Sequence, residues 1–246
     1  MTGPYSTDLA YIHHAGFGEF AESVAPEIVR LLRGHGIKSG GIVEAGCGSG
    51  ILAGRLVDAG YDVTAFDASP AMIRLARANT PGRLRASRFG AQGRATFRVA
   101  RLERAPIPPC RAVIAIGEVI AYARSFRRFF RRASAALPTG GLFIFDFIES
   151  AERRTYPPKS RGGADWAIVA QADVNRAGTI LTRHITTFRK IGREYRRSQE
   201  VHRVRIYSRD DIGSALAAAG FAFRMRRSYG SCRLLPGDVA VVAERE

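Results

Sequence analysis

The sequence predicts an α/β fold in which a mostly parallel sheet binds a ligand at the carboxyl ends of its strands. Apolar runs of strand length alternate with amphipathic runs of helix length along most of the chain. A turn with three glycines, residues 46–50, directly follows a short apolar run at residues 42–43. A second run, residues 61–66, ends at Asp67. Ligands of open α/β sheets bind beyond such strand ends, so both features belong to one expected binding site.

The length and composition favour a cytoplasmic protein with one main domain. The 246 residues are enough for one domain with an inserted segment. No apolar run is long enough to span a membrane and the N-terminus does not resemble a leader, so we expect no membrane contact. The three cysteines are too few and too scattered for a disulfide framework or a zinc site, and we expect no metal.

The chain is strongly basic, with a formal net charge of +16. Such a charge in general favours nucleic-acid binding. Here, however, only Lys38, Lys159 and Lys190 are lysines, and arginine is spread along the chain together with abundant alanine and glycine. This skew is typical of a GC-rich coding bias, so nucleic acid is not the favoured partner.

The glycine turn leads into a helix, because apolar residues recur at helical spacing over residues 51–57. Glycine lets the backbone approach a ligand closely, and the free N–H groups at a helix start favour polar or anionic groups. The pattern Gly48-x-Gly50-x-x-Ala53 also fits a dinucleotide site. The glycines alone therefore leave two classes of cofactor open.

Flanking residues favour S-adenosylmethionine over a dinucleotide. Glu44 stands two residues before the first glycine, and Asp67 ends the next strand, where its carboxylate can accept both ribose hydroxyls. The stretch from Glu44 to Gly50, together with Asp67-Ala68-Ser69-Pro70-Ala71-Met72, resembles the class I S-adenosylmethionine-dependent methyltransferases. The resemblance spans roughly residues 40–150 and the C-terminal strands.

The resemblance implies S-adenosyl-L-methionine as the cofactor and S-adenosyl-L-homocysteine as its product. Where the family commonly places an acidic residue against the adenine, this chain has Arg101, which leaves that contact to backbone groups near Leu102. The implied cofactor-binding residues are Glu44, Gly46, Cys47, Gly48, Gly50, Asp67, Ala68, Met72, Leu102 and Gly117.

The resemblance also implies a seven-stranded, mostly parallel Rossmann-like methyltransferase sheet. We expect its third to fifth strands at residues 95–100, 112–116 and 142–147. The last two strands, residues 221–227 and 239–243, would form a hairpin with the final strand antiparallel in the sheet. Serine caps predict helices after Ser69 and Ser208. Residues 80–93, rich in glycine and arginine, predict a long loop.

An insertion interrupts this scheme after residue 150. Residues 150–163 carry two prolines and predict a linker, and three extended stretches follow at residues 166–174, 180–188 and 195–206. Turn residues between these stretches predict an antiparallel β cap over the active-site mouth, with homodimer formation through the cap as the alternative role. The expected units are N-terminal lid helices (1–40), a cofactor-binding core (41–150), the cap (151–206) and a C-terminal helix with a β-hairpin (207–246).

Methyl transfer from a sulfonium depends mainly on alignment, so the sequence need not show a strong catalytic signature. A positioned base helps when the acceptor is a hydroxyl. The candidate catalytic residues are Glu118 after the fourth strand, His13 in the lid and His184 in the cap, with His202 as the other cap histidine. Candidate substrate-binding residues are Tyr11, His14, Tyr122, Asp146, Trp166 and Arg183.

The leading hypothesis is a methyltransferase that uses S-adenosylmethionine to methylate N or O of a small molecule. An RNA or protein methyltransferase that uses the arginine-rich surface is one alternative, and a non-catalytic protein that binds S-adenosylmethionine is another. Pro109-Cys110 matches the dipeptide of C5-cytosine methyltransferases, but it precedes the fourth strand instead of following it. This position argues against Cys110 as a nucleophile.

Overall fold

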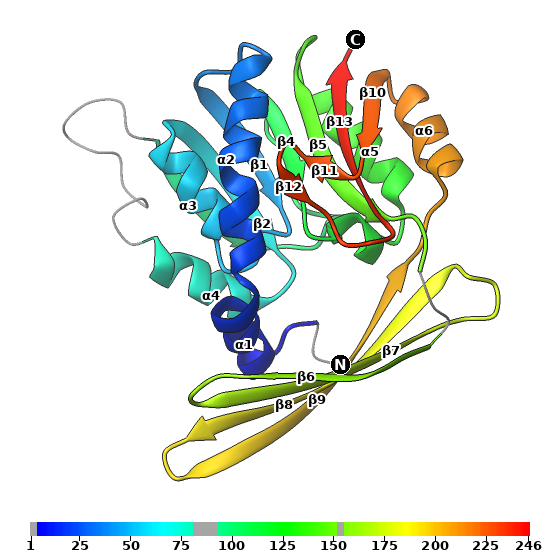
Figure 1. The fold of residues 1–246 in the computed structure, drawn as a ribbon. Coiled ribbons are helices and arrows are strands. Elements are labelled where there is room, and N and C mark those ends of the chain that lie inside the picture. Colours follow the sequence, from blue (N-terminus) through cyan, green and yellow to red (C-terminus); the bar gives the residue numbers. More distant parts are fainter. Residues whose placement is uncertain (1–3, 81–92, 152–154) are drawn as a thin grey trace.

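The computed structural model describes residues 4–80, 93–151 and 155–246 and contains a seven-stranded sheet (Figure 1). The strand order is β3-β2-β1-β4-β5-β13-β10, and all neighbours run parallel except β13, which is antiparallel to β5 and β10. This order confirms the predicted sheet with its antiparallel final strand. The strands are β1 (Gly40–Ala45), β2 (Tyr61–Asp67), β3 (Ala95–Val99), β4 (Ala112–Ala115), β5 (Leu142–Ile148), β10 (Phe221–Arg226) and β13 (Asp238–Arg245), with a small separate ribbon of β11 (Ser228–Tyr229) and β12 (Cys232–Arg233).

Helices cover both faces of this sheet (Figure 1). They are α1 (Thr7–Phe17), α2 (Glu19–Gly34), α3 (Ile51–Asp58), α4 (Pro70–Asn79), α5 (Phe126–Ala136) and α6 (Arg209–Ala217), with a short 3-10 helix η2 (Val119–Tyr122). Ile42 and Ile114 pack with α2, α3 and α4, whereas Val43 and Val113 pack with α5 and α6, because successive strand residues point to opposite faces. In the described ranges, no helix has both the length and the apolar character that crossing a bilayer requires.

Local sequence signals begin two helices where they were predicted. Ser69 Oγ accepts a hydrogen bond from Met72 N at 3.2 Å, and Pro70 takes the first position of α4. Ser208 Oγ accepts from Asp211 N at 3.0 Å at the start of α6. Both predicted caps are therefore confirmed. The loop predicted at residues 80–93 lies, apart from its two end residues, outside the described part of the chain.

The insertion is a four-stranded antiparallel sheet, which we call the cap. Its strands are β6 (Thr155–Gly162), β7 (Trp166–Val174), β8 (Ile180–Ile191) and β9 (Glu194–Arg205), in that spatial order. The linker predicted at residues 150–163 is wrong over most of its length, because it forms β6. Pro157 and Pro158 are tolerated because β6 is an edge strand whose pairing register shifts between Tyr156 and Lys159.

Helix α1 lies between the cap and the rest of the molecule (Figure 1). Trp166 and Ile168 of β7 pack with Leu9 and Ile12 of α1 in a small apolar cluster. Trp166 is only 7% exposed, and a Cβ on Gly16 of α1 would come within 2.5 Å of its ring. This close packing fixes α1 to the cap.

We expect Trp166→Ala to lower the free energy of unfolding by about 3 kcal/mol, because it empties the apolar cluster that joins the cap to α1. Urea unfolding followed by circular dichroism measures this change. Tyr195→Ala is the matched control, because Tyr195 lies on cap strand β9 and is 59% exposed, so its removal should change stability by less than about 0.5 kcal/mol. Equal losses in the two variants would contradict the packing role of Trp166.

Candidate active site

The glycine turn is a tight loop tied to the neighbouring strand. The N–H groups of Gly46 and Cys47 donate to the Phe66 carbonyl of β2 at 2.8 and 3.0 Å. The three glycines of the turn all have positive φ, between 52° and 78°. A Cβ on Gly46 would come within 2.4 Å of Val119, whereas a Cβ on Gly48 would meet no atom within 4 Å. The loop therefore packs against the protein at one glycine and borders open space at the next.

Asp67 holds this loop from the carboxyl end of β2. Its Oδ2 accepts the Gly48 N–H at 3.0 Å and its Oδ1 accepts the Ser69 N–H at 2.8 Å. Burial raises the pKa of Asp67, and these two hydrogen bonds lower it in part. The carboxylate thus contacts the glycine loop and the start of α4 together, where the sequence predicts a ribose contact.

Glu44, near the end of β1, is a buried carboxyl with an unsatisfied atom. Glu44 is 4% exposed and, among the described residues, its Oε2 has no hydrogen-bond partner. Burial, followed by repulsion from Asp67, raises the pKa of Glu44 to about 8. Because an unpaired buried acceptor is costly, a hydrogen-bond donor or a cation bound at the loop would stabilise this group.

These residues fit the cofactor that the sequence resemblance implies. S-adenosylmethionine carries ribose hydroxyls, a cationic sulfur and an ammonium group. A buried carboxyl, Glu44, and a partly buried one, Asp67, favour a ligand that is cationic and donates hydrogen bonds. The open space at Gly48 allows such a ligand to approach the backbone.

The other predicted cofactor residues surround the loop in less direct positions. Burial raises the pKa of the Cys47 thiol well above its usual value, so this cysteine is an inert packing group. Met72 is buried in the first turn of α4, and Ala68 connects β2 to that helix. Leu102 packs into the core, and its carbonyl accepts from Arg132 Nη1 at 2.8 Å.

Asp146 of β5 organises the loop that follows β4. The residue is 2% exposed, and its carboxylate accepts the N–H groups of Gly117 and Glu118 at 2.9 and 2.5 Å and the Tyr229 hydroxyl at 3.3 Å. Burial raises the pKa of Asp146 to about 7, against the lowering effect of the two backbone hydrogen bonds. Both of its oxygens are engaged within the protein, so Asp146 shapes the loop at the predicted substrate site.

The same loop aims Glu118 at the cap. Glu118 has a φ of 61°, a left-handed conformation that is uncommon outside glycine. Its two carboxylate oxygens accept from Nη1 and Nη2 of Arg183 on β8 at 2.6 and 2.9 Å. The two side chains are only 14% and 28% exposed. Burial opposes the charge of Arg183, but the carboxylate outweighs it and raises the pKa of Arg183.

A second chain of polar contacts runs from η2 into the cap. The Tyr122 hydroxyl lies 3.1 Å from His202 Nδ1, and His202 Nε2 lies 2.9 Å from Glu200 Oε2. Glu200 also accepts the N–H groups of Tyr5 and Ser6, both at 2.8 Å. Sequence reasoning singled out Tyr122, named His202 as an alternative, and missed Tyr5 and Glu200.

Strand alternation decides where the two cap histidines point. His202 pairs across the sheet with Arg183, whereas His184 pairs with Val201 on the opposite face. The Nε2 of His184 lies 3.4 Å from Asp173 Oδ2, and both side chains are about half exposed. The structure therefore brings His202 to the predicted residues Tyr122 and Arg183, and it places His184 on the outer face of the cap.

The alternate arginines near the end of β9 are the sequence signal that would have identified Glu200. Positions Glu200, His202 and Val204 are shielded, and the arginines Arg203 and Arg205 between and after them are exposed. Arginines at alternate positions of a predicted strand mark its solvent face. By that rule Glu200 and His202 share the inner face.

Helix α1 connects the cap to the glycine loop. The Nδ1 of His14 lies 2.9 Å from Ser49 Oγ in the glycine turn. The Tyr11 hydroxyl donates to Asp165 of the cap at 3.0 Å, and the Arg189 guanidinium lies 3.1 Å from the centre of the Tyr11 ring. Predicted site residues of α1 thus contact both the core and the cap, while Trp166 lies in the apolar cluster described above.

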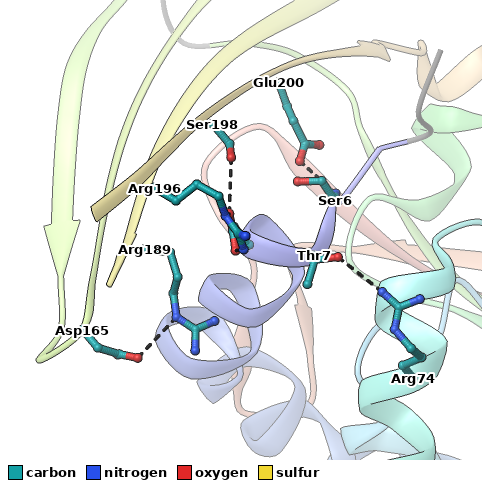
Figure 2. A network of polar contacts seen from close by, with 9 residues as sticks. Ser6, Thr7, Arg74, Asp165, Arg189, Arg196, Ser198 and Glu200 are labelled. Atoms are coloured by element: carbon teal, nitrogen blue, oxygen red, sulfur yellow. Dashed lines mark hydrogen bonds and ion pairs between the residues drawn. The ribbon is translucent and has the colours of Figure 1, made fainter. Parts of the chain in front are cut away.

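Ion pairs reinforce these connections, as Figure 2 shows. Asp8 accepts from Nε and Nη2 of Arg196 at 2.6 and 2.5 Å, and Ser198 adds a hydrogen bond at 3.3 Å. On the other side of α1, Arg74 of α4 donates to Thr7 Oγ1 at 3.3 Å. The Arg196 hydrogen bonds lower the pKa of Asp8, so the pair is charged at neutral pH.

His13, the remaining predicted catalytic residue, is half-buried on α1. Its ring meets the Tyr5 ring edge to face with centroids 5.1 Å apart. Burial lowers the pKa of His13 to about 4, and the neighbouring His14 and His202 add to this effect. His13 is therefore neutral at pH 7.

Comparison with known families identifies a catalytic domain in the core. Residues 42–141 match the model of a methyltransferase domain. The matched segment contains the glycine loop, Asp67 and the loop after β4. Comparison with curated proteins gave no match.

Solved structures share the fold over almost the whole chain. An S-adenosylmethionine-dependent methyltransferase from Clostridium acetobutylicum has a TM-score of 0.78 at 15% identity, covering 96% of this chain and 97% of that one. A sugar N-methyltransferase from a Streptoalloteichus species has a TM-score of 0.75 at 19% identity, with 100% and 96% covered. An amino pentose methyltransferase from Micromonospora echinaspora, solved with S-adenosylmethionine bound, has a TM-score of 0.72 at 17% identity, with 100% and 99% covered.

The buried carboxyls predict how stability depends on pH. The pKa of Glu44 is raised from 4.5 to about 8, so the folded protein keeps a proton that the unfolded chain releases. Between pH 6.5 and 8 we therefore expect the free energy of unfolding to fall as pH rises, by up to about 1.4 kcal/mol per pH unit for this group. Between pH 4 and 6.5 the unfolded chain protonates His13 and the folded protein does not, so this group makes the free energy of unfolding rise with pH. Urea unfolding of the cofactor-free protein at each pH measures the slope.

Glu44→Gln should make this slope shallower, because the amide does not titrate. Glu194→Gln is the matched control, since Glu194 is exposed at the start of β9 and its exchange should leave the slope unchanged. A slope in Glu44→Gln equal to that of the unmodified protein would show that Glu44 does not hold the proton.

Proposed function

We propose that the chain is an S-adenosylmethionine-dependent methyltransferase that methylates an amine nitrogen of a small, polar acceptor held between the core and the cap. The cofactor is S-adenosylmethionine. It supplies a methyl group on a cationic sulfur, which leaves the protein the tasks of orienting the acceptor and receiving its proton. We assign cofactor binding to Glu44, Asp67 and the loop from Gly46 to Gly50.

The observation that carries the proposal is the Glu118–Arg183 pair with Tyr122 beside it. The pair joins the loop after β4 to the cap, at the carboxyl edge of the sheet where α/β proteins bind their ligands. Tyr122 lies at the same boundary, since it contacts His202 of β9. An acceptor at this boundary would be enclosed by the core, the cap and α1, which favours a small molecule over a polymer.

The charges around this boundary favour an amine. Asp238, at the start of β13, is buried near Glu118 and Asp146, and burial followed by these two carboxylates raises its pKa to about 7. The two arginines that act on Asp238 are each paired with another carboxylate, Arg183 with Glu118 and Arg227 with Glu149, which leaves the carboxyls of Asp146 and Asp238 without an ion-pair partner of their own. A protonated amine would stabilise this excess of carboxyls, and a neutral sugar hydroxyl would not.

Two of the structural relatives support an amine acceptor. One is titled a sugar N-methyltransferase and the other an amino pentose methyltransferase, and both align with this chain over its full length, which includes the cap. On this basis amino sugars are the first compounds to test. The tyrosines and charged groups at the core–cap boundary suit an acceptor rich in hydroxyl groups.

The proposal is tested by supplying S-adenosylmethionine with a labelled methyl group together with a panel of acceptors. The panel contains amino hexoses, amino pentoses, the corresponding sugars without an amine, total RNA and a protein extract. We expect label on the amine-bearing sugars, each heavier by one methylene in the mass spectrum. Label only on the amine-free sugars would replace nitrogen by oxygen as the acceptor atom. Label only on RNA or protein would overturn the small-molecule proposal.

The assignment of the glycine loop predicts a selective loss of cofactor affinity in Gly48→Ala. The new methyl group would enter the open space where we place the cofactor. We expect the dissociation constant for S-adenosylhomocysteine, measured by calorimetry, to rise at least about tenfold. Gly60→Ala is the matched control, because Gly60 also has a positive φ and open space at its Cβ but lies in the turn between α3 and β2. Equal affinities in the two variants would contradict the assignment.

A further inference from the structure

We propose that Tyr122, His202 and Glu200 form a relay that carries the acceptor's proton into the cap, an inference that rests on the proposed acceptor site. In this relay Tyr122 is the residue that touches the acceptor. His202 acts through Tyr122, and Glu200 stabilises the charge that His202 gains. None of these three roles belongs to the cofactor loop.

The geometry of the three groups is that of a hydrogen-bonded series. Tyr122 Oη lies 3.1 Å from His202 Nδ1, and Glu200 Oε2 lies 2.9 Å from His202 Nε2. His202 is 3% exposed, so the imidazole does not exchange protons freely with solvent. Both ring nitrogens therefore have a partner inside the protein, one a hydroxyl and the other a carboxylate.

The carboxylate fixes the tautomer of the histidine. Glu200 can only accept, so neutral His202 carries its proton on Nε2 and donates it to Glu200. Nδ1 is then an acceptor and faces the hydroxyl of Tyr122. Burial raises the pKa of Tyr122 to about 12, so this hydroxyl keeps its proton at neutral pH unless it passes it on. The series is thus oriented to move a proton from Tyr122 to His202.

Every element packed against His202 contributes a charged or titratable neighbour. The N-terminal segment contributes Tyr5, whose ring centroid is 4.9 Å away. Helix α1 contributes His13, and strand β8 contributes Arg183 as the cross-strand partner of His202. Glu118, the ion-pair partner of Arg183, compensates the nearest positive charge. Glu200 is therefore the carboxylate that remains to stabilise an imidazolium.

Glu200 is itself held in place by the N-terminal segment. Its two oxygens accept the backbone N–H groups of Tyr5 and Ser6 just before α1. These bonds and the one to His202 lower the pKa of Glu200 against the effect of burial. A histidine that served only to fill the cap would not need a shielded carboxylate supported in this way.

The proton balance of the relay is simple. The acceptor attacks as the neutral amine, because a protonated nitrogen has no lone pair, so an amine that binds in its protonated form first releases one proton to solvent. When the nitrogen has gained its methyl group, one N–H bond breaks and its electron pair stays on nitrogen. That proton forms a new bond to Tyr122 Oη, while the original hydroxyl proton moves to Nδ1 of His202. The products are a neutral methylated amine and an imidazolium paired with the Glu200 carboxylate.

The first test needs no acceptor and uses histidine-labelled protein saturated with S-adenosylhomocysteine. Nitrogen NMR resolves the five histidines, and loss of one signal set in His202→Asn assigns His202. We expect the Nε2–H tautomer in the unmodified protein, and a smaller share of this tautomer in Glu200→Gln, which lacks the carboxylate that fixes it. We also expect Tyr122→Phe to shift the Nδ1 resonance. The opposite tautomer, or the same tautomer share in Glu200→Gln, overturns the relay.

The second test is the pH profile of kcat, measured with the panel amino sugar that gives the most product. We expect His202→Asn to lower kcat about 100-fold at neutral pH and to abolish its acid limb, with KM changed less than about twofold. Asp173→Asn, which removes a carboxylate beside a histidine on the outer face of the same sheet, is the control and should leave the pH profile of kcat unchanged. An equal loss at every pH, with the acid limb intact, would assign His202 a structural role and overturn the proposal.

These tests separate the relay from the proposed function. If no small amine is methylated, the proposed function fails. The NMR result still decides whether Nδ1 of His202 is free to accept a proton from the Tyr122 hydroxyl. If amines are methylated but the acid limb survives in His202→Asn, the relay fails and the function stands.

Discussion

The contact between the core and the cap depends on one buried carboxylate, that of Asp146, which holds the loop after β4. It accepts two successive backbone N–H groups from the loop after β4 and is itself held by the Tyr229 hydroxyl. These bonds stabilise the left-handed conformation of Glu118, which a non-glycine residue rarely adopts. By fixing this conformation, the bonds direct the Glu118 side chain from the loop after β4 toward Arg183 of the cap.

The cofactor side is built on the same physical device with a different outcome. There Asp67 accepts two backbone N–H groups, while the neighbouring Glu44 has an oxygen without a partner among the described residues. One carboxylate is thus satisfied by the fold and the other is left to a ligand. Because Glu44 is buried and Asp67 is shielded in part, their negative charge is costly unless a cation is near. This arrangement matches S-adenosylmethionine, a cationic cofactor.

Much of this could be predicted from the sequence, because the signals are local. The glycine turn, Asp67 at a strand end and the serine caps of α4 and α6 each depend on a few consecutive residues. Glu118 and Arg183 were predicted separately, but their pairing joins residues 65 positions apart and depends on where the cap docks. β6 was missed because its prolines are acceptable only at an edge with a register shift, which is a tertiary property.

Helix α1 has a consequence that neither half of the active site has alone. It contacts the glycine turn through His14 and the cap through Asp8 and Tyr11, so one element is bonded to both binding regions. If a ligand on one side changes the position of α1, it also changes the affinity for a ligand on the other side, and reciprocity makes the factor the same in both directions.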